Sequence, residues 1–338
     1  MKKCKKIVLL LLFILTLNVN NLGMIDKKVV VTSKEYKEGN TRNLVLNKIL
    51  SDNELQEEKE NMFNYASNGS YISSVDPETG LQYGNNPSQV TNGLYSMEDE
   101  DGISYYYRGN IDNNNIQFGE YESDYYVYGI NENYFQTKES CMSVSANEEW
   151  CQPLKLASTG DKMYWKIVRV NGDGSLRLIY NGTSTNSINN DLASSYAVGY
   201  STYNFEKNNP KYAGYTYDRD TNETNSFIKK EVDAWYSNTL GSSSYDSKVI
   251  EGRFCSDSSG YKMVGNYNFR NVYYYIFSSY DRLGQANNNF AKPNSPTLKC
   301  PSTTESYGGS YRLKAGLITA DELVLAGESA TVVGNSYL

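Results

Sequence analysis

The side chains with which this sequence could do chemistry are its acids, cysteines and tyrosines, because it contains no histidine. Without histidine, neither a Ser-His-Asp nor a Cys-His nucleophile can form, and a His-ligated zinc site is excluded. Paired carboxylates, which carry out glycoside hydrolysis, are the acid–base chemistry that remains. The acids gather in turn-like segments such as Glu98 to Asp101 and Asp218 to Asp220, where we expect water to solvate them. We therefore predict a protein that is not an enzyme, with a carboxylate-based hydrolase as one alternative.

The cysteines are better suited to disulfides than to metal binding. Four of the five lie beyond the first 25 residues: Cys141, Cys151, Cys255 and Cys300. An even set in an exported chain is typical of a disulfide framework, and the C-x-x-C spacing of many metal sites is absent. Four cysteines allow three connectivities. We favour Cys141–Cys151 and Cys255–Cys300, because each pair closes within one sequence neighbourhood.

The first residues have the pattern of an export signal. Four lysines precede an apolar run from Ile7 to Leu17 that only Thr16 interrupts. A basic head before such a run is typical of signal peptides, and a membrane span needs about 20 apolar residues. We expect residues 1–25 to be a signal peptide and the protein to be secreted or displayed on the cell surface. Because no Ala-x-Ala site follows, an uncleaved anchor that meets the membrane through residues 7–17 is the alternative.

Charge and metal-loop patterns limit the partners. Removing the four lysines of residues 1–25, which contain no acid, takes the net charge from −7 to about −11. An acidic chain repels phosphate backbones, so we expect an extracellular protein or glycan as partner and no nucleic acid. EF-hand-like starts near Asp99 and Asp218 lack the required glycine or final glutamate in register. We predict no cofactor, and an irregular Ca²⁺ site built from scattered Asp and Asn is left open.

Aromatic residues supply the candidate binding surface. The chain has 32 tyrosines and 10 phenylalanines, a bias that AT-rich codons would also produce. Tyrosine is a rigid, amphipathic contact residue, although alternate tyrosines can simply fill a strand face. Our candidates for ligand contact come from the tyrosine clusters: Tyr105, Tyr107, Tyr126 and Tyr274. We expect Trp165 and Trp235 to be core residues and Trp150 to pack on the disulfide of its neighbour Cys151.

These side chains must be positioned mainly by strands after residue 100. Ile103–Arg108 and Ile116–Phe118 are β-branched and aromatic, and the polar turn between them predicts a hairpin. Residues 164–170 and 175–180 predict a second hairpin, with a type I′ turn at Asn171-Gly172. The polar, weakly patterned residues 26–99 predict a low-order region that contains one helix, from about 43 to 63, and a linker.

Two helices are signalled near the end of the chain. Apolar residues from Phe227 to Leu240 recur at helical spacing behind a cap at Asn225 or Ser226, and Gly241 supplies a stop. The outer face carries Lys229, Lys230, Glu231 and Asp233. Thr319 and Glu322 form a capping box that begins a short helix. Since the chain stops soon afterwards, we expect a missing closing strand and an exposed apolar strip near Trp165 or Leu178.

The segment from Tyr164 to Tyr180, with its Trp-Lys-Ile-Val-Arg-Val-Asn-Gly-Asp-Gly string, resembles a signature of surface proteins from gut Firmicutes and related bacteria. The resemblance covers about residues 43 to 328, including Val232-Asp-Ala-Trp-Tyr236 and Arg253-Phe-Cys255. The order of elements is similar to that of C-type-lectin-like domains of the formylglycine-generating-enzyme type. Those domains carry Leu-Pro-Thr-x-x-Glu-Trp where this chain has Leu317 to Leu323, without the Pro and Trp. The resemblance implies a fold and a surface location, and no reaction.

Together these observations predict an α+β fold of small twisted antiparallel sheets with one main amphipathic helix and a C-type-lectin-like architecture. Its domain would span residues 100–338 and be incomplete at the C-terminus. The function that we expect is that of a cell-surface binding or adhesion module. A structural component of a surface assembly is the alternative from a different class.

Overall fold

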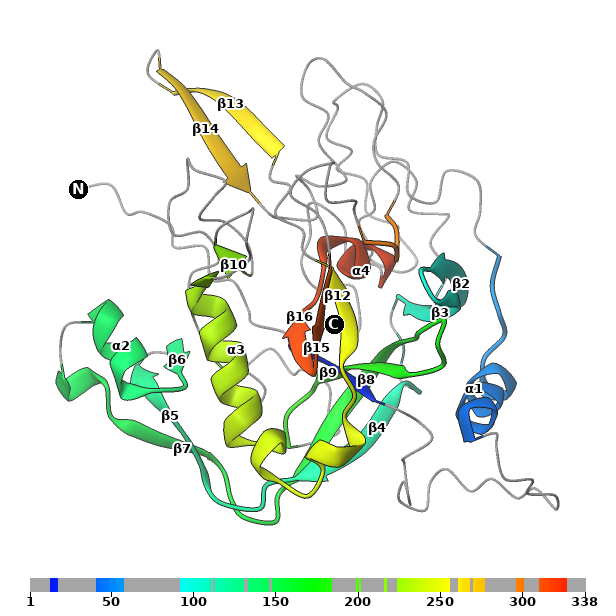
Figure 1. The fold of residues 1–338 in the computed structure, drawn as a ribbon, viewed down its shortest axis with the longest axis horizontal. Coiled ribbons are helices and arrows are strands. Elements are labelled where there is room, and N and C mark those ends of the chain that lie inside the picture. The colour runs from blue at the N-terminus through cyan, green and yellow to red at the C-terminus, as the bar shows by residue number, and fades with distance from the viewer. Residues whose placement is uncertain are drawn as a thin grey trace, which may run out of the picture.

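The computed structural model describes residues 13–17, 41–57, 92–109, 111, 113–130, 133–145, 148–183, 199, 201, 216–217, 224–255, 261–267, 270–276, 296–300 and 310–326. These residues form several small antiparallel sheets and a few helices (Figure 1). The predicted α+β class is confirmed at this level.

The largest sheet runs through the centre of the molecule (Figure 1). Its strands are β1 (Phe13–Leu17), β2 (Gly93–Asp99), β3 (Gly102–Arg108), β4 (Asn115–Glu120), β8 (Lys162–Val170), β9 (Leu176–Tyr180) and β16 (Ala315–Leu317). The spatial order is β16-β1-β9-β8-β3-β2, every neighbouring pair is antiparallel, and β4 also pairs with β8. Strands β8 and β9 are buried almost throughout, as strands covered on both faces must be.

The β8–β9 hairpin was predicted correctly, but its turn was not. Asn171 N–H donates to Ser175 O, and Gly174 N–H donates to Asn171 O. Gly174 has φ of +81°, so the loop is a three-residue turn with a left-handed glycine rather than a type I′ turn at Asn171-Gly172. Gly172 has a different role, because a Cβ added there would lie 2.4 Å from an oxygen of Asp99. The close approach of two turns requires glycine at that position.

The hairpin predicted from Ile103–Arg108 and Ile116–Phe118 is wrong. Strands β3 and β4 exist, but both pair with the same edge of β8 at successive positions: Tyr106 is opposite Arg169, and Ile116 is opposite Trp165. The partner of β3 on its other edge is β2. Strand β8 is long enough to pair with both, so the backbone groups of β4 find partners without β3.

We expected a closing strand to be missing near Trp165 or Leu178, but the edge of β9, which contains Leu178, is occupied. Residues of β1 lie between β9 and β16, with Leu15 opposite both Leu178 and Ala315. Leu178 and Trp165 are fully buried, so the predicted exposed strip beside them is wrong. The strand that covers this edge comes from the apolar run of the expected signal peptide.

The N-terminal helix is shorter than predicted, and the sheet begins earlier. Helix α1 covers Thr41–Asp52, and Leu55 then makes a parallel bridge to Leu94 of β2 instead of continuing the helix. Ile49 of α1 belongs to the main core. Because β2 pairs with β3 along its whole length, the sheet includes residues before the expected boundary at 100.

Helices α3 (Phe227–Asn238) and α4 (Ala320–Leu325) confirm the two predicted helices. Ser226 caps α3 by accepting a hydrogen bond from Lys229 N–H at 3.1 Å. The predicted outer face of α3 is wrong at Glu231, which is buried, whereas Phe227 is 43% exposed. No helix in the described part of the chain is long and apolar enough to cross a membrane.

A lobe lies beside α3, to its left in Figure 1. It consists of β5 (Tyr125–Ile130), β6 (Asn133–Phe135), α2 (Lys138–Ser145), a 3-10 helix (Glu148–Trp150) and β7 (Pro153–Ala157). The Cys141–Cys151 disulfide closes it, with Phe135 packed against both cysteines. We call these elements the lobe.

Smaller pairs of strands complete the described structure. They are β10 (Thr216–Tyr217) with β11 (Thr224–Asn225), β12 (Gly252–Cys255) with β15 (Ser310–Leu313), and β13 (Tyr261–Tyr267) with β14 (Arg270–Ile276). The Cys255–Cys300 disulfide joins the end of β12 to a distant segment. Both predicted cysteine pairings are therefore confirmed.

The main core lies between the sheet and α3. The Trp165 and Trp235 rings are 6.1 Å apart between centroids, and the Tyr180 ring contacts both of them. Trp165 Nε1 donates to Phe118 O at 2.6 Å, so the indole N–H is satisfied away from water. Both tryptophans are fully buried, which confirms them as core residues.

Candidate functional site

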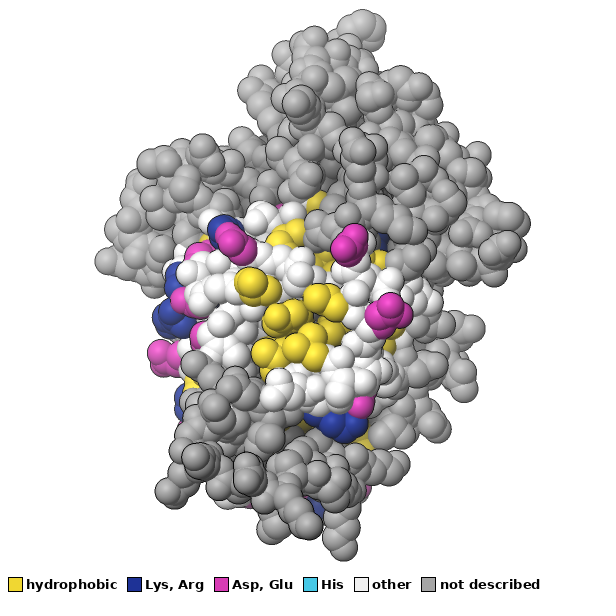
Figure 2. All heavy atoms as spheres, turned by 90° about the vertical axis from the view of Figure 1, so that its right-hand side faces the viewer, with side chains coloured by type: hydrophobic (Ala, Val, Ile, Leu, Met, Phe, Trp, Pro, Cys, Tyr) yellow, Lys and Arg dark blue, Asp and Glu magenta, His cyan; other side chains and the backbone are white. Residues whose placement is uncertain are grey.

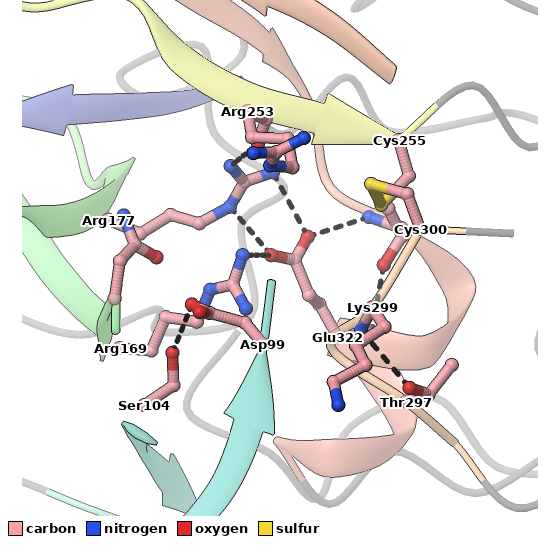
Figure 3. Close-up of polar contacts among 12 residues, drawn as sticks. Asp99, Ser104, Arg169, Arg177, Arg253, Cys255, Thr297, Lys299, Cys300 and Glu322 are labelled. Carbon is pink, nitrogen blue, oxygen red and sulfur yellow. Dashed lines mark hydrogen bonds and ion pairs between the residues drawn. A yellow bond between two sulfur atoms is a disulfide. The ribbon is translucent and has the colours of Figure 1, made fainter. Parts of the chain in front are cut away.

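A buried group of charges lies where Glu322 of α4 meets Arg169 of β8 and Arg177 of β9. Figure 3 shows the guanidinium groups of Arg169 and Arg177 directed toward the carboxylate of Glu322. Arg177 Nε is 2.6 Å from Glu322 Oε1, and Arg169 Nη2 is 3.5 Å from the same oxygen. The capping box fixes the carboxylate: Thr319 N–H donates to Glu322 Oε2 at 3.0 Å, and Glu322 N–H donates to Thr319 Oγ1 at 3.1 Å.

The charges in this group stabilise one another. Burial raises the pKa of Glu322, but the charges of Arg177 and Arg169 outweigh burial and hold the pKa below its usual value. Burial lowers the pKa of Arg177 to about 10, so its guanidinium stays protonated at neutral pH. Arg177 also donates to Arg253 O at 2.9 Å. Since both carboxylate oxygens of Glu322 face fixed partners, this group joins strands and does not offer a free acid or base.

Asp99 forms a second fixed carboxylate beside the first. It accepts hydrogen bonds from the N–H groups of Asp101 and Gly172 at 2.8 Å and from the Ser104 hydroxyl at 2.5 Å. Burial raises the pKa of Asp99, but the bonds from Gly172, Ser104 and Asp101 outweigh burial and lower it. Asp99 therefore ties the β2–β3 turn to the β8–β9 loop as an ionised acceptor.

A small cavity opens next to these two carboxylates. Its walls include Asp99, Glu100, Asp101, Arg169, Asp173, Arg253 and the Cys255–Cys300 disulfide. Several acids thus share one cavity, whereas the sequence predicted separate, solvated acids in turns. The volume is about 20 Å³, and a single water molecule needs about 10–15 Å³. Pockets for small organic ligands measure about 300–1,000 Å³, so the cavity fits water and no sugar ring.

Metal-binding residues do not gather in the described part of the chain. No group of three or more cysteines, aspartates or glutamates in it is placed to hold a metal ion. The acids that line the cavity have protein partners instead: Arg253 is 3.4 Å from Asp101 and 3.7 Å from Glu100, and Asp173 accepts hydrogen bonds from the N–H and the hydroxyl of Ser175.

The structure separates the four candidate tyrosines. Tyr107 is a core residue whose hydroxyl accepts a hydrogen bond from Asn53, and burial raises its pKa to about 12. Tyr105 is half-buried in β3, whereas Tyr126 in β5 is 46% exposed. Tyr274 lies in β14 opposite Met263, but the structure describes only the backbone of this strand. Of the candidates, Tyr126 presents a ring to solvent, and Tyr107 has no exposed ring with which to contact a ligand.

The lobe carries an exposed tryptophan beside its disulfide. We expected Trp150 to pack on the neighbouring disulfide, but its side chain is 54% exposed. The side chains buried with the disulfide are Phe135 and, in part, Tyr128 and Met142. The acidic, polar stretch before Trp150, Ala146-Asn147-Glu148-Glu149, is the signal that could have indicated exposure.

A second apolar surface lies on the opposite side of the molecule from the lobe. Figure 2 shows apolar side chains gathered near the centre of the side on which α1 and the β2–β3 hairpin lie. Leu55, just after α1, is 45% exposed, and Ile103 in β3 is 57% exposed. On the lobe, the exposed large apolar residues are Tyr126, Trp150 and Leu154.

Comparisons with known proteins add no relative: no protein-family model, no curated protein and no solved structure matches this chain.

Proposed function

We propose that this protein is an exported binding or adhesion module of the cell surface, with a C-type-lectin-like architecture and no catalytic role. Its ligand would be an extracellular protein or glycan. The two disulfides point to an oxidising, extracellular environment. The remaining support comes from the lobe.

The observation that carries the proposal is the exposure of two large aromatic rings on the lobe. Trp150 is 54% and Tyr126 is 46% exposed. An exposed indole on a segment closed by a disulfide is already ordered before a ligand arrives, so binding costs little conformational entropy. Tryptophan and tyrosine dominate the energetics of binding surfaces for the same reason.

The polar neighbours of these rings suit a wet, specific interface. Lys155, opposite Tyr126 in the β5–β7 pair, is 2.6 Å from Asp124, and Lys138 is 2.5 Å from Glu148 near Trp150. Exposed aromatic rings among charged groups resemble the centre and rim of a binding surface. The small cavity beside Glu322 has no room for a sugar ring, so this group of acids does not supply the site of a carboxylate-based hydrolase.

Binding of the full chain to arrays of immobilised glycans and of purified extracellular-matrix proteins would test the proposal. We expect binding on one of the arrays, weakened at least about tenfold by Trp150→Ala, since a residue that dominates a binding surface contributes about 2 kcal/mol or more. Ile103→Ala is the matched control, because Ile103 is equally exposed on the other apolar surface. If binding survives Trp150→Ala but is lost with Ile103→Ala, the binding site lies on the surface around Ile103 and not on the lobe. No binding on either array would refute the proposal.

A further inference from the structure

The position of β1 points to a property that does not depend on the lobe surface. Leu15 is opposite Leu178 of β9 on one side and opposite Ala315 of β16 on the other. Both neighbours lie more than a hundred residues away in sequence. The same segment is the apolar run of the expected export signal. If export removes that signal, the sheet loses a strand from its interior and not from its edge.

The strands on both sides of β1 are held by contacts that do not involve it. Strand β9 pairs with β8 from Trp165 to Val170. Strand β16 packs so closely on β12 that a Cβ added at Gly316 would lie 2.5 Å from the Phe254 ring. Phe254 also clusters with Ile179 of β9 and contacts the Arg177 guanidinium at 4.2 Å. Phe254 thus bridges the two sides, and α4 adds the Glu322–Arg177 ion pair.

Removing β1 would leave a gap that β9 and β16 cannot close. Neighbouring strands lie about 4.8 Å apart, so the two strands would face each other across about 10 Å. The backbone groups of residues 176–179 and 315–317 that face β1 would then have no partners. Unpaired strand edges are templates for another strand, and here two edges face one space.

We propose that the space between β9 and β16 is a strand-acceptor site, held by the leader strand before export and filled afterwards by a strand of another exported polypeptide. The incoming strand must run antiparallel to both neighbours, as β1 does. It must be uncharged and apolar, because Leu176, Leu178 and Ala315 beside it are buried and Arg177 is already paired with Glu322. A strand of the same chain is a poorer source, since every other described strand already has a partner.

The test uses the full chain with a specific protease site inserted between residues 18 and 25. After the folded chain is cut, a fluorescent peptide of residues 7–17 with a soluble lysine tail is added, and binding is measured by anisotropy. We expect saturable uptake, together with protection from hydrogen exchange of those amides of residues 176–179 and 315–317 that face the gap. A Leu15→Pro peptide should bind at least about 100-fold more weakly, because proline cannot donate to a ladder with partners on both sides.

A locked variant provides the control. Leu15→Cys with Ala315→Cys joins two residues that are opposite in register, so the oxidised, cut chain should take up no peptide and the reduced chain should regain uptake. The proposal fails if both peptides bind alike, or if the cut chain takes up no peptide. It also fails if the cut chain unfolds, or if a peptide of residues 327–338 fills the site better than residues 7–17. Secreted protein that keeps its leader in the sheet would refute it as well.

Discussion

The centre of the main sheet and the lobe use charged and aromatic residues in opposite ways. In the centre, Arg177 and Glu322 are almost completely buried and face each other, and Trp165 and Trp235 fill the core. In the lobe, the ion pair between Lys138 and Glu148 is exposed, and a disulfide closes the segment. The buried charges of the centre are engaged with one another and do not reach solvent. A region held by a covalent bond can leave its aromatic rings in water.

The largest expected effect comes from breaking the central pair. Glu322→Ala would leave Arg177 buried without its carboxylate, and removing one partner of a buried ion pair costs about 3–5 kcal/mol. Glu148→Ala removes the carboxylate of an exposed pair in the lobe, where solvent screens the charges and the loss should be far smaller. Urea unfolding of both variants measures the contrast. Equal losses in the two variants would show that burial does not distinguish the two regions.

The disulfides give the next largest effect. Closing a loop restricts the unfolded chain, and the sequence separations are 10 residues for Cys141–Cys151 and 45 for Cys255–Cys300. Loop entropy then predicts losses of about 2.8 and about 4 kcal/mol when each pair is replaced by serine, as upper estimates. Unfolding in urea without reductant measures both. A larger loss for the lobe pair would mean that this disulfide stabilises the folded lobe directly, beyond its effect on the unfolded chain.

The features that were predicted correctly from the sequence have local causes. Ser226, Thr319 and Glu322 signal helix starts through bonds to residues three positions away. The β8–β9 hairpin likewise depends on adjacent residues. Its turn was misassigned because two glycines, Gly172 and Gly174, lie within three residues, and the contact of Gly172 with the β2–β3 turn is tertiary.

The features that were missed depend on which strands compete for the same edge. Strand β4 pairs with β8 rather than with β3, and β1 covers β9, although neither choice follows from hydrophobic pattern. Glu231 illustrates the same limit at the site level. Its position on α3 faces the lobe, and its carboxylate accepts a bond from Gln136 N–H at 2.7 Å. An acid on an otherwise polar helix face gives no sign that another element will cover it.

The pH dependence should differ in sign between Glu322 in the centre and Glu231, which faces the lobe from α3. The pKa of Glu322 is lowered, so its contribution is present above its unfolded pKa of about 4.3 and is lost as pH falls through the folded pKa. Burial raises the pKa of Glu231, so stability tied to its neutral form is present below about pH 4.3 and is lost as pH rises through the folded pKa.

Glu322→Gln and Glu231→Gln separate these two contributions. We expect the deficit of Glu322→Gln relative to the parent protein to shrink between about pH 4.3 and pH 2.5. Between pH 7 and about pH 4.3 the parent protein should instead gain stability relative to Glu231→Gln. Melting temperatures at the three pH values measure both trends. Parallel trends in the two variants would mean that Glu231 is held as an ionised acceptor, as Glu322 is.

The smallest expected change in stability is that of Trp150→Ala, and it tests the comparison most directly. Substitution at an exposed position normally changes stability by less than about 0.5 kcal/mol, whereas truncating a buried tryptophan costs about 3–5 kcal/mol. Trp235→Ala is therefore the matched variant, because it makes the same chemical change in the core. If Trp150→Ala unfolds as the parent protein does while weakening binding on the arrays, its ring is free for a ligand. If it destabilises the protein as much as Trp235→Ala does, the ring is part of the packing of the lobe. Both regions would then use their tryptophans for packing and would differ only in the disulfide that closes the lobe. The proposal that the lobe is the binding surface would be refuted.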